Sequence, residues 1–355
     1  MLPVKNFTDF IEQNNLFEPG SKILAAVSGG MDSVLMAHLL KAAGFNFAIA
    51  HCNFQLRGDE AAADQQFVNQ LALQSGIPFH TINFDTKKYA AEHKISIQMA
   101  ARELRYQWFN EISQQHGYDV IALAHHQNDA IETILLNLTR GTGIAGLHGI
   151  LPKNGLLVRP LLFLKRDEIQ DIVNSNGLAY VEDSSNSSAK YARNKIRLEV
   201  IPKLKELNPA LESIFEHNLK HFRNLEILLE QKLDELRGTI FSIHSDEIHL
   251  PVPAIKELRP QTLLLYGLLQ NYGFNETTVD DVISALDKHS GRVFESPGFM
   301  LTLDREKLIL TKKHASVTEA VQIDEGRHEV NYNNYRLNIL HDDSPLIIKD
   351  NQMAV

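Results

Sequence analysis

The chain has 355 residues, a length that corresponds to two or three domains of ordinary size. Hydrophobic residues make up 44% and charged residues 22%, as in globular proteins, and no apolar run reaches the roughly 18 residues of a membrane helix. The net charge of −9 argues against a bulk electrostatic binder of nucleic acid, although a local basic face can still contact phosphates. The single cysteine, Cys52, excludes an internal disulfide framework, and with no secretory signal at the start we expect a cytoplasmic protein.

Residues 22 to about 165 alternate between short apolar runs and helical patterns. Strands are predicted at 22–27, 45–52, 77–84, 119–126 and 156–162, and helices at 32–44, 59–76, 96–117 and 128–141. Continuously apolar strands that alternate with helices indicate a parallel sheet covered on both faces. Ligands of such sheets bind at the carboxyl ends of the strands, and we expect a site there.

The second half has a different pattern. A mostly helical stretch is followed by a strand, two helices, a hairpin that turns near Asp304 and Arg305, and a strand-like tail; these are predicted at 189–240, 248–255, 260–273, 277–289, 292–313 and 321–340. The sequence therefore predicts an α/β protein in three parts. A parallel-sheet, Rossmann-like domain spans 1–204, a smaller α+β domain spans 205–315, and a partial β-rich segment spans 316–355.

The first predicted strand leads into a helix through the stretch S-G-G-M-D-S, residues 28–33. Glycines at such a junction let successive amide N–H groups face one anion, and the helix dipole adds positive potential. Ser28 and Ser33 add hydroxyl donors, whereas Asp32 suits an anion site only with magnesium between them, or as a helix cap. The stretch is neither G-x-x-x-x-G-K-[ST] nor G-x-G-x-x-G, and a plain strand-to-helix turn is the alternative.

This loop resembles the pyrophosphate-binding loop of the PP-loop ATPases, which split ATP between the α and β phosphates. Further segments resemble the tRNA(Ile)-lysidine synthetase family within that superfamily: AHCNFQLRGDEAAADQQFV, AARELRYQWF, AHHQNDAIETILLNLTRGTGIAGLHGI, RPLL, EDSSN and YARNKIR. Some positions depart from the family pattern. Phe54 stands where members have a second histidine, and Asn128 stands where many have an aspartate.

The resemblance implies an activity. ATP adenylates the C2 oxygen of the wobble cytidine in the isoleucine tRNA with a CAU anticodon, and the ε-amine of free L-lysine then attacks C2 and expels AMP, leaving lysidine. It also implies magnesium as a cofactor and, because members are often dimeric, a possible homodimer. A thiolating PP-loop enzyme is disfavoured by the single cysteine. A non-catalytic protein that binds nucleotide or RNA on the same fold is the other alternative.

The resemblance also suggests which residues carry the reaction. The ATP-binding candidates are Ser28, Gly29, Gly30, Met31, Asp32, Ser33, His51 and Asn53. Asp32 and Asp129 are the candidate magnesium ligands. Asp129 and Glu132 are spaced i, i+3 at a predicted helix start, where they could hold magnesium or the lysine ammonium, or merely favour the helix dipole. Arg105 is the candidate for stabilising charge near the α-phosphate or the cytidine carbonyl.

Contact with tRNA needs local positive charge, and one predicted helical stretch supplies it. Its candidates for tRNA binding are Lys190, Arg193, Lys195 and Arg197. Closure over the site and a solvated helix face are the alternatives. The adjacent pair His125 and His126 indicates a shared metal only weakly, because neighbouring residues at a strand end point to opposite faces.

Overall fold

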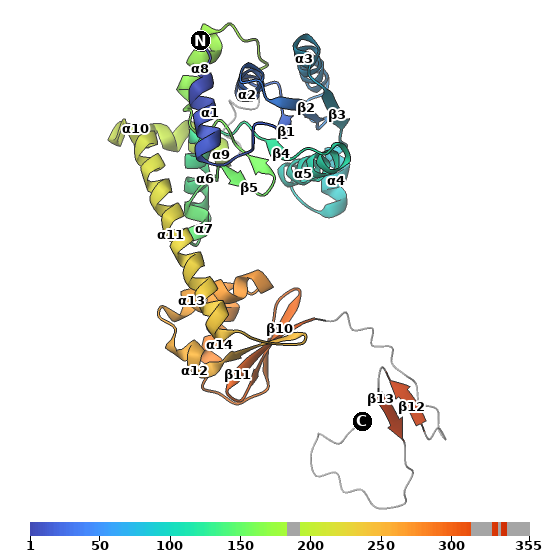
Figure 1. Ribbon diagram of the computed structural model, residues 1–355, viewed down its shortest axis with the longest axis vertical. Coiled ribbons are helices and arrows are strands. Elements are labelled where there is room, and N and C mark those ends of the chain that lie inside the picture. The colour runs from blue at the N-terminus through green and yellow to red at the C-terminus, as the bar shows by residue number, and fades with distance from the viewer. Residues whose placement is uncertain (183–191, 314–328, 333–334, 339–355) are drawn as a thin grey trace, which may run out of the picture. The chain divides into compact units, whose positions relative to one another are not determined.

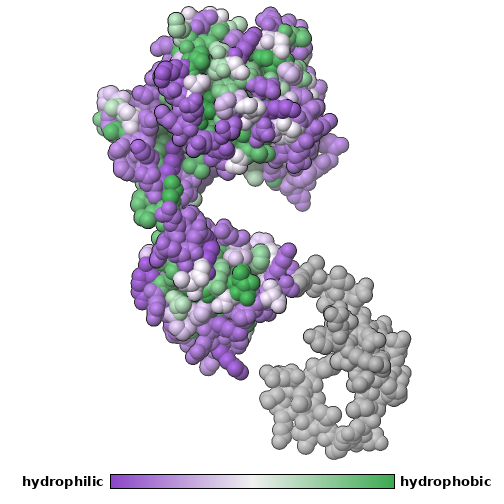
Figure 2. Space-filling view, viewed as in Figure 1, coloured by the Kyte–Doolittle hydropathy of each residue, from purple (hydrophilic) through white to green (hydrophobic). Residues whose placement is uncertain are grey.

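The computed structural model describes residues 1–182, 192–313, 329–332 and 335–338. The chain divides into two compact units, residues 1–230 and 231–355. Figure 1 shows unit 1 as a sheet with helices around it and unit 2 as a smaller group of helices and strands. Figure 2 shows that the visible surface of both units is mostly hydrophilic, with hydrophobic residues in scattered patches. No helix of the described residues is long and apolar enough to cross a membrane.

Unit 1 is built on a six-stranded sheet of order β3-β2-β1-β4-β6-β5. The strands are β1 Lys22–Ala26, β2 Asn46–Asn53, β3 Phe79–Asn83, β4 Val120–Ala122, β5 Lys153–Asn154 and β6 Leu157–Val158. All neighbours pair in parallel except β5, which pairs antiparallel with β6 at one edge. The strand order reverses at β1, which lies between β2 and β4, and such a reversal opens a crevice at the carboxyl ends of the two strands.

Helices cover both faces of this sheet. They are α1 Val4–Gln13, α2 Met31–Ala42, α3 Asp59–Ser75, α4 Thr86–His93, α5 Ile97–His116, α6 Gln127–Arg140, α7 Ile144–Leu147 and α8 Arg166–Ser175. Alternate residues of β1 enter different cores. Ile23 packs with Leu35 of α2 on one face, whereas Leu24 packs with Phe109 of α5 on the other, and all of them are buried. The continuously apolar strand is therefore explained by burial on both faces.

A helical segment that begins after residue 191 packs against α6. It comprises α9 Ala192–Lys195, a π-helical turn η2 at Ile196–Val200, α10 Ile201–Leu207 and the first part of α11 Leu211–Ile240. Ile131 of α6 packs with Ile196 and Leu211 in one small core. Gly149 lies close to α6 and α11, because a Cβ there would be 2.9 Å from Leu219 Cδ2 and 3.3 Å from the Ala130 carbonyl oxygen. This packing holds residues 192–200, which carry Arg193, Lys195 and Arg197 and are called the basic segment below, beside the start of α6.

Unit 2 contains a five-stranded antiparallel sheet of order β7-β8-β11-β10-β9. Its strands are β7 Ser242–His244, β8 Glu247–Pro251, β9 Arg292–Glu295, β10 Phe299–Asp304 and β11 Lys307–Lys312. Its helices are α12 Val252–Glu257, α13 Gln261–Leu269, the 3₁₀ turn η3 Gln270–Tyr272 and α14 Glu276–Ala285. Two further strands, β12 Glu329–Tyr332 and β13 Tyr335–Asn338, form a separate antiparallel pair.

Some predicted elements were wrong or missed. The strand predicted at 248–255 ends at Pro251, and residues 252–257 are helical instead. A proline in the first helical turn is favourable there, because that turn does not need its N–H group. Helices α1, α4, α7 and α8 were not among the predicted elements. Lys190 and most of the tail predicted at 321–340 lie outside the described residues.

Candidate active site

A cavity of about 880 Å³ lies in unit 1, and its walls include the ends of β1 and β4 and the first turn of α2. Its volume falls within the range of small-molecule sites, roughly 300–1,000 Å³. The predicted site residues that line it are Ser28, Gly30, Met31, Asp32, Ser33, Arg105, Asp129, Arg193 and Arg197. The structure therefore brings the glycine turn, α5, α6 and the basic segment around one space. The described candidates that do not line it are Gly29, His51, Asn53, Glu132 and Lys195.

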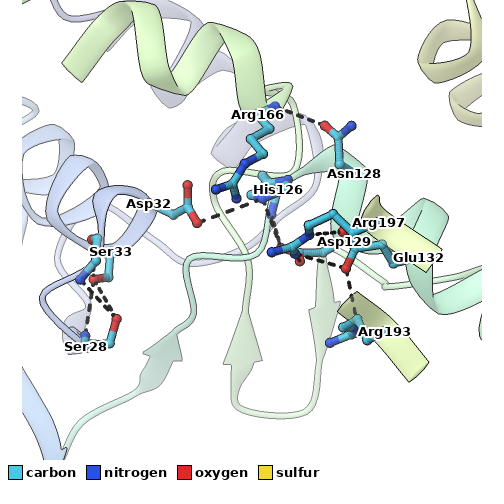
Figure 3. A network of polar contacts seen from close by, with 11 residues as sticks. Ser28, Asp32, Ser33, His126, Asn128, Asp129, Glu132, Arg166, Arg193 and Arg197 are labelled. Atoms are coloured by element: carbon cyan, nitrogen blue, oxygen red, sulfur yellow. Dashed lines mark hydrogen bonds and ion pairs between the residues drawn. The ribbon is translucent and has the colours of Figure 1, made fainter. Parts of the chain in front are cut away.

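Hydrogen bonds between two serines close the turn after β1 (Figure 3). The Ser28 N–H donates to Ser33 Oγ over 3.2 Å, and the Gly30 N–H donates to Ser28 Oγ over 3.3 Å. These two amides are therefore engaged within the turn. The N–H groups of the first turn of α2, which starts at Met31, have no acceptor inside the helix. They are the donors that remain for an anion at this end of the cavity.

Gly29 holds the turn in a conformation that other residues rarely adopt. Its φ is +99°, and a Cβ there would be 3.3 Å from Val68 Cγ2. The Gly29 carbonyl accepts a hydrogen bond of 2.9 Å from the Val181 N–H, which ties the turn to another wall of the cavity. Gly29 therefore shapes the turn from behind, while Gly30 faces the cavity.

His51 and Asn53 lie behind the same region. His51 is buried, and its Nδ1–H donates to the Val27 carbonyl over 2.9 Å, just before the turn. Burial lowers the pKa of this imidazole, which keeps the ring neutral. The Asn53 amide donates to Gln65 over 2.8 Å and fixes the connection from β2 to α3. Both residues support the walls of the cavity and do not line it. The sequence motif alone could not distinguish residues that support the wall from residues that line the cavity.

Two aspartates from different elements meet at one buried histidine (Figure 3). His126 Nε2 lies 3.9 Å from Asp32 Oδ2 of α2 and 3.6 Å from Asp129 Oδ2 of α6, and the histidine is 1% exposed. The His126 N–H also donates to Asp129 Oδ2 over 3.0 Å, so this carboxylate caps the start of α6. From the sequence, His126 was expected only as a weak metal ligand, and its place between the two aspartates was not predicted.

The pKa values of the two aspartates are shifted in opposite directions. Burial raises the pKa of Asp32, and the neighbouring Asp129 adds to that rise. Burial acts in the same direction on Asp129, but His126, His125, a backbone hydrogen bond and Arg197 outweigh it and lower the pKa of Asp129. Asp129 is therefore the firmly ionised member. Asp32 Oδ1 is buried with no hydrogen-bond partner among the described residues, and this oxygen remains available to a cation.

The two arginines of the basic segment turn toward α6. Arg197 forms a bidentate pair with Glu132, at 2.5 and 3.0 Å, and lies 3.3 Å from Asp129 Oδ1. Arg193 lies 3.6 Å from Glu132 Oε2 and donates to the Thr133 hydroxyl. Burial would lower the pKa of Arg197, but hydrogen bonds and charge from Glu132 and the charge of Asp129 outweigh it and raise that pKa.

The acidic candidate Glu132 and the basic candidates Arg193 and Arg197 are paired with one another. Glu132 is 0% exposed and sits behind Arg197, so its direct contact is with the guanidinium groups. Arg193 and Arg197 line the cavity with part of their charge already neutralised. Lys195 points elsewhere: its side chain is 63% exposed and lies 4.0 Å from Glu199. Of the described basic candidates, Lys195 is the most exposed to solvent.

Arg166 and His125 also line the cavity, and the sequence analysis did not assign them to it. Arg166 begins α8, where a cation opposes the helix dipole by about 0.3–1 kcal/mol, and that conflict is a signal the sequence contained. Its charge lowers the pKa of Asp32. Burial lowers the pKa of His125 to about 4, so a neutral imidazole faces the cavity at neutral pH.

The donor set suits magnesium rather than a transition metal. Among the described residues, no group of three or more His, Cys, Asp or Glu side chains could hold a metal ion. Magnesium usually takes only one or two carboxylates and fills its remaining positions with water and phosphate oxygens. Asp32, with its unpartnered Oδ1, and Asp129 offer two carboxylates on the same cavity. The residues present therefore fit such an ion.

A parallel sheet of this order, with a glycine turn after β1 and paired aspartates facing it, defines a nucleotide-using PP-loop domain. Residues 4–204 match the PP-loop domain family, and residues 243–313 match the TilS substrate binding domain family. A U34-tRNA thiolase from Methanococcus maripaludis has a similar fold, with a TM-score of 0.51 and 16% identity over 62% of this chain and 79% of that one. The predicted fold class is confirmed.

Curated relatives identify the family within that class. The tRNA(Ile)-lysidine synthase of Bacteroides thetaiotaomicron is 40% identical over 85% of this chain and 70% of its own length. That of Porphyromonas gingivalis is 38% identical over 84% of this chain and 65% of its own length. That of Chlorobaculum tepidum is 37% identical over 81% of this chain and 90% of its own length. The chain belongs to the tRNA(Ile)-lysidine synthase family, as its motifs predicted.

Proposed function

We propose that this chain is an ATP-dependent ligase that joins free L-lysine to C2 of the wobble cytidine in the isoleucine tRNA with a CAU anticodon, with release of AMP and pyrophosphate. The name of the relatives bears out the function and the enzyme class predicted from the motifs, and it does not favour thiolation or binding alone. The observation that carries the proposal is the meeting of Asp32 and Asp129 at His126, on the same cavity as the turn at 28–33.

The phosphates of ATP are proposed to bind at the first turn of α2. The N–H groups that start this helix, beginning at Met31, face an anion without reorganisation, and the helix dipole favours negative charge there. Ser28 and Ser33 shape this end of the cavity through their hydroxyl pair. The pyrophosphate that leaves would be held by the same donors that bound it in ATP.

Asp129 is proposed to receive the ε-amine of free lysine. A lysine ammonium is mostly charged at neutral pH, whereas the attack on C2 requires a neutral amine. The ionised carboxylate of Asp129 can orient the ammonium and accept its proton as the C–N bond forms and AMP leaves. Glu132 is proposed to act through Arg197, which it holds against Asp129.

Asp32, with its unpartnered Oδ1, is the residue that would hold Mg²⁺, which when bound would neutralise charge on the phosphates of ATP during adenylyl transfer. Asp129, the other magnesium candidate, is assigned to the lysine amine instead. Arg105 is proposed to stabilise charge at the α-phosphate or the cytidine carbonyl. Lys195 is the described lysine that we propose for tRNA contact, with Arg193 and Arg197 closing the site beneath the tRNA. The domain division at 204 and 315, a homodimer and a cytoplasmic location stay predictions.

The activity is tested by incubating the protein with ATP, lysine, magnesium and transcripts of the isoleucine and methionine tRNAs that share the CAU anticodon. Mass analysis of the wobble nucleoside is expected to find lysidine in the isoleucine transcript alone. Asp129→Asn is expected to lower turnover by about 10²–10³-fold, because it removes the carboxylate that accepts the proton. Asp171→Asn, at an exposed position of α8, is the matched control. Full turnover by Asp129→Asn would remove that residue from the mechanism.

A further inference from the structure

Three of the arginines that line the cavity are held in different ways. Arg193 and Arg197 are paired with carboxylates of α6. Arg105, which lies on α5, has no carboxylate partner in the part of the chain that the structure describes. Its guanidinium carbon instead lies over the ring of Phe54, 5.1 Å from the ring centroid. Of these three arginines, Arg105, which is proposed to meet negative charge in the reaction, is thus the one without a carboxylate partner among the described residues.

Phe54 is fixed from its other side. Its ring stacks on Phe84, with centroids 5.6 Å apart and an angle of 24° between the planes. Phe84 in turn meets the buried Trp108 edge to face, with centroids 6.4 Å apart. The Phe54 carbonyl accepts a hydrogen bond of 2.9 Å from the buried hydroxyl of Thr86. The ring beneath Arg105 is therefore held by its backbone and by a stacked neighbour.

An aromatic face holds a cation differently from a carboxylate. A carboxylate partner offsets the positive charge of the guanidinium and occupies some of its five N–H donors. A ring attracts the cation through its quadrupole and leaves the N–H donors free in the plane of the guanidinium. Phe54 and Arg105 both line the cavity, so this arrangement presents an oriented and unneutralised charge to a bound substrate.

We propose that Phe54 is the positioning residue for Arg105 in this chain. The inference rests on the proposed function only in taking Arg105 to stabilise charge during adenylyl transfer. The ring keeps the guanidinium aimed at the developing charge, and the stack on Phe84 keeps the ring in place. Removal of the ring is expected to lower kcat rather than to raise the KM for ATP, because the orientation of the Arg105 guanidinium contributes most when negative charge develops in the transition state.

Steady-state kinetics of Phe54→Leu, Phe54→Tyr and Arg105→Ala test this. Phe54→Leu keeps an apolar side chain but has no ring, and kcat is expected to fall about tenfold. Phe54→Tyr keeps the ring and is expected to stay within about twofold of the parent protein. In the Arg105→Ala background, Phe54→Leu is expected to add less than about twofold, because the two residues act as one unit. Equal effects of Phe54→Leu in both backgrounds would overturn the proposal.

Two further measurements separate this inference from the proposed function. The rate at which phenylglyoxal modifies Arg105, followed by mass spectrometry of the peptide, can be measured without turnover. Modification is expected to be faster in Phe54→Leu than in the parent protein. An unchanged rate would refute the contact between Phe54 and Arg105. Phe163→Leu is the matched control, since Phe163 forms a similar ring pair with Phe10 but does not line the cavity. Lack of lysidine formation by the parent protein would refute the proposed function and leave the modification result to decide the role of Phe54.

Discussion

The turn at 28–33 and the entrance to α6 face the same cavity but are built in opposite ways. The turn uses glycine conformation, serine hydroxyls and main-chain groups, all within six residues of one another. The entrance to α6 uses full charges, and its arginine and carboxylate partners lie 60 or more residues apart in the sequence. A rigid anion site can be encoded locally, whereas a charged cluster depends on the packing of distant helices.

The two designs predict different costs of mutation. In the cluster a largely buried charge that loses its partner is only partly reached by water, so a single change there is expected to be severe. In the turn the cost comes from backbone strain and is expected to be smaller.

Glu132→Gln is expected to have the largest effect on stability. The side chain is 0% exposed and forms two hydrogen bonds to Arg197, so loss of its charge leaves a guanidinium only partly compensated. We expect a loss of about 3 kcal/mol in the free energy of unfolding, which corresponds to a fall in Tm of roughly 6–12 °C for a unit of this size. Thermal melts followed by circular dichroism measure it.

The matched control is Glu199→Gln. Glu199 is 53% exposed and lies 4.0 Å from Lys195, and an exposed pair of this kind contributes about 0–1 kcal/mol. Equal Tm values for Glu132→Gln and the parent protein would show that the cluster is not held by charge, and the contrast with the turn would then be lost.

Gly29→Ala tests the turn. A side chain at a φ of +99° is strained, and the new Cβ would lie 3.3 Å from Val68. We expect a loss of about 1–3 kcal/mol in the free energy of unfolding. Gly30→Ala is the comparison for stability, because Gly30 has a φ of −70° and the nearest atom to its Cβ would be Ser28 Oγ at 3.5 Å. Urea titrations of both variants measure the difference, and equal stabilities would contradict the strain assigned to Gly29.

The contrast between the regions also explains what the sequence could predict. The parallel sheet, the turn and the position of Asp129 follow from apolar periodicity, glycine chemistry and helix-start patterns, each a local property. The pairing of Arg197 with Glu132 could not be read in that way, because it depends on how α9 and η2 pack against α6. A run of basic residues in a sequence does not reveal which of them form ion pairs with carboxylates of the same chain.

His51→Asn is expected to have the smallest effect, and one that depends on pH. Burial places the folded-state pKa of His51 below its ordinary value near 6.5, so between the two values the unfolded chain binds more protons than the folded one. The free energy of unfolding of the parent protein should therefore fall as the pH drops through that window. Asparagine can keep a donor for the Val27 carbonyl but does not titrate, so the variant should lose less stability there.

Urea titrations between pH 7 and pH 5 measure the two slopes. A parent slope equal to that of His51→Asn would show that the ring is not held neutral by burial. The same comparison bears on the turn, because the Val27 carbonyl that His51 holds lies directly before Ser28. If the histidine anchors the turn, acid should weaken ATP binding more in the parent protein than in the asparagine variant. A carboxylate cluster alone would give both proteins the same acid dependence, since His51→Asn leaves that cluster unchanged.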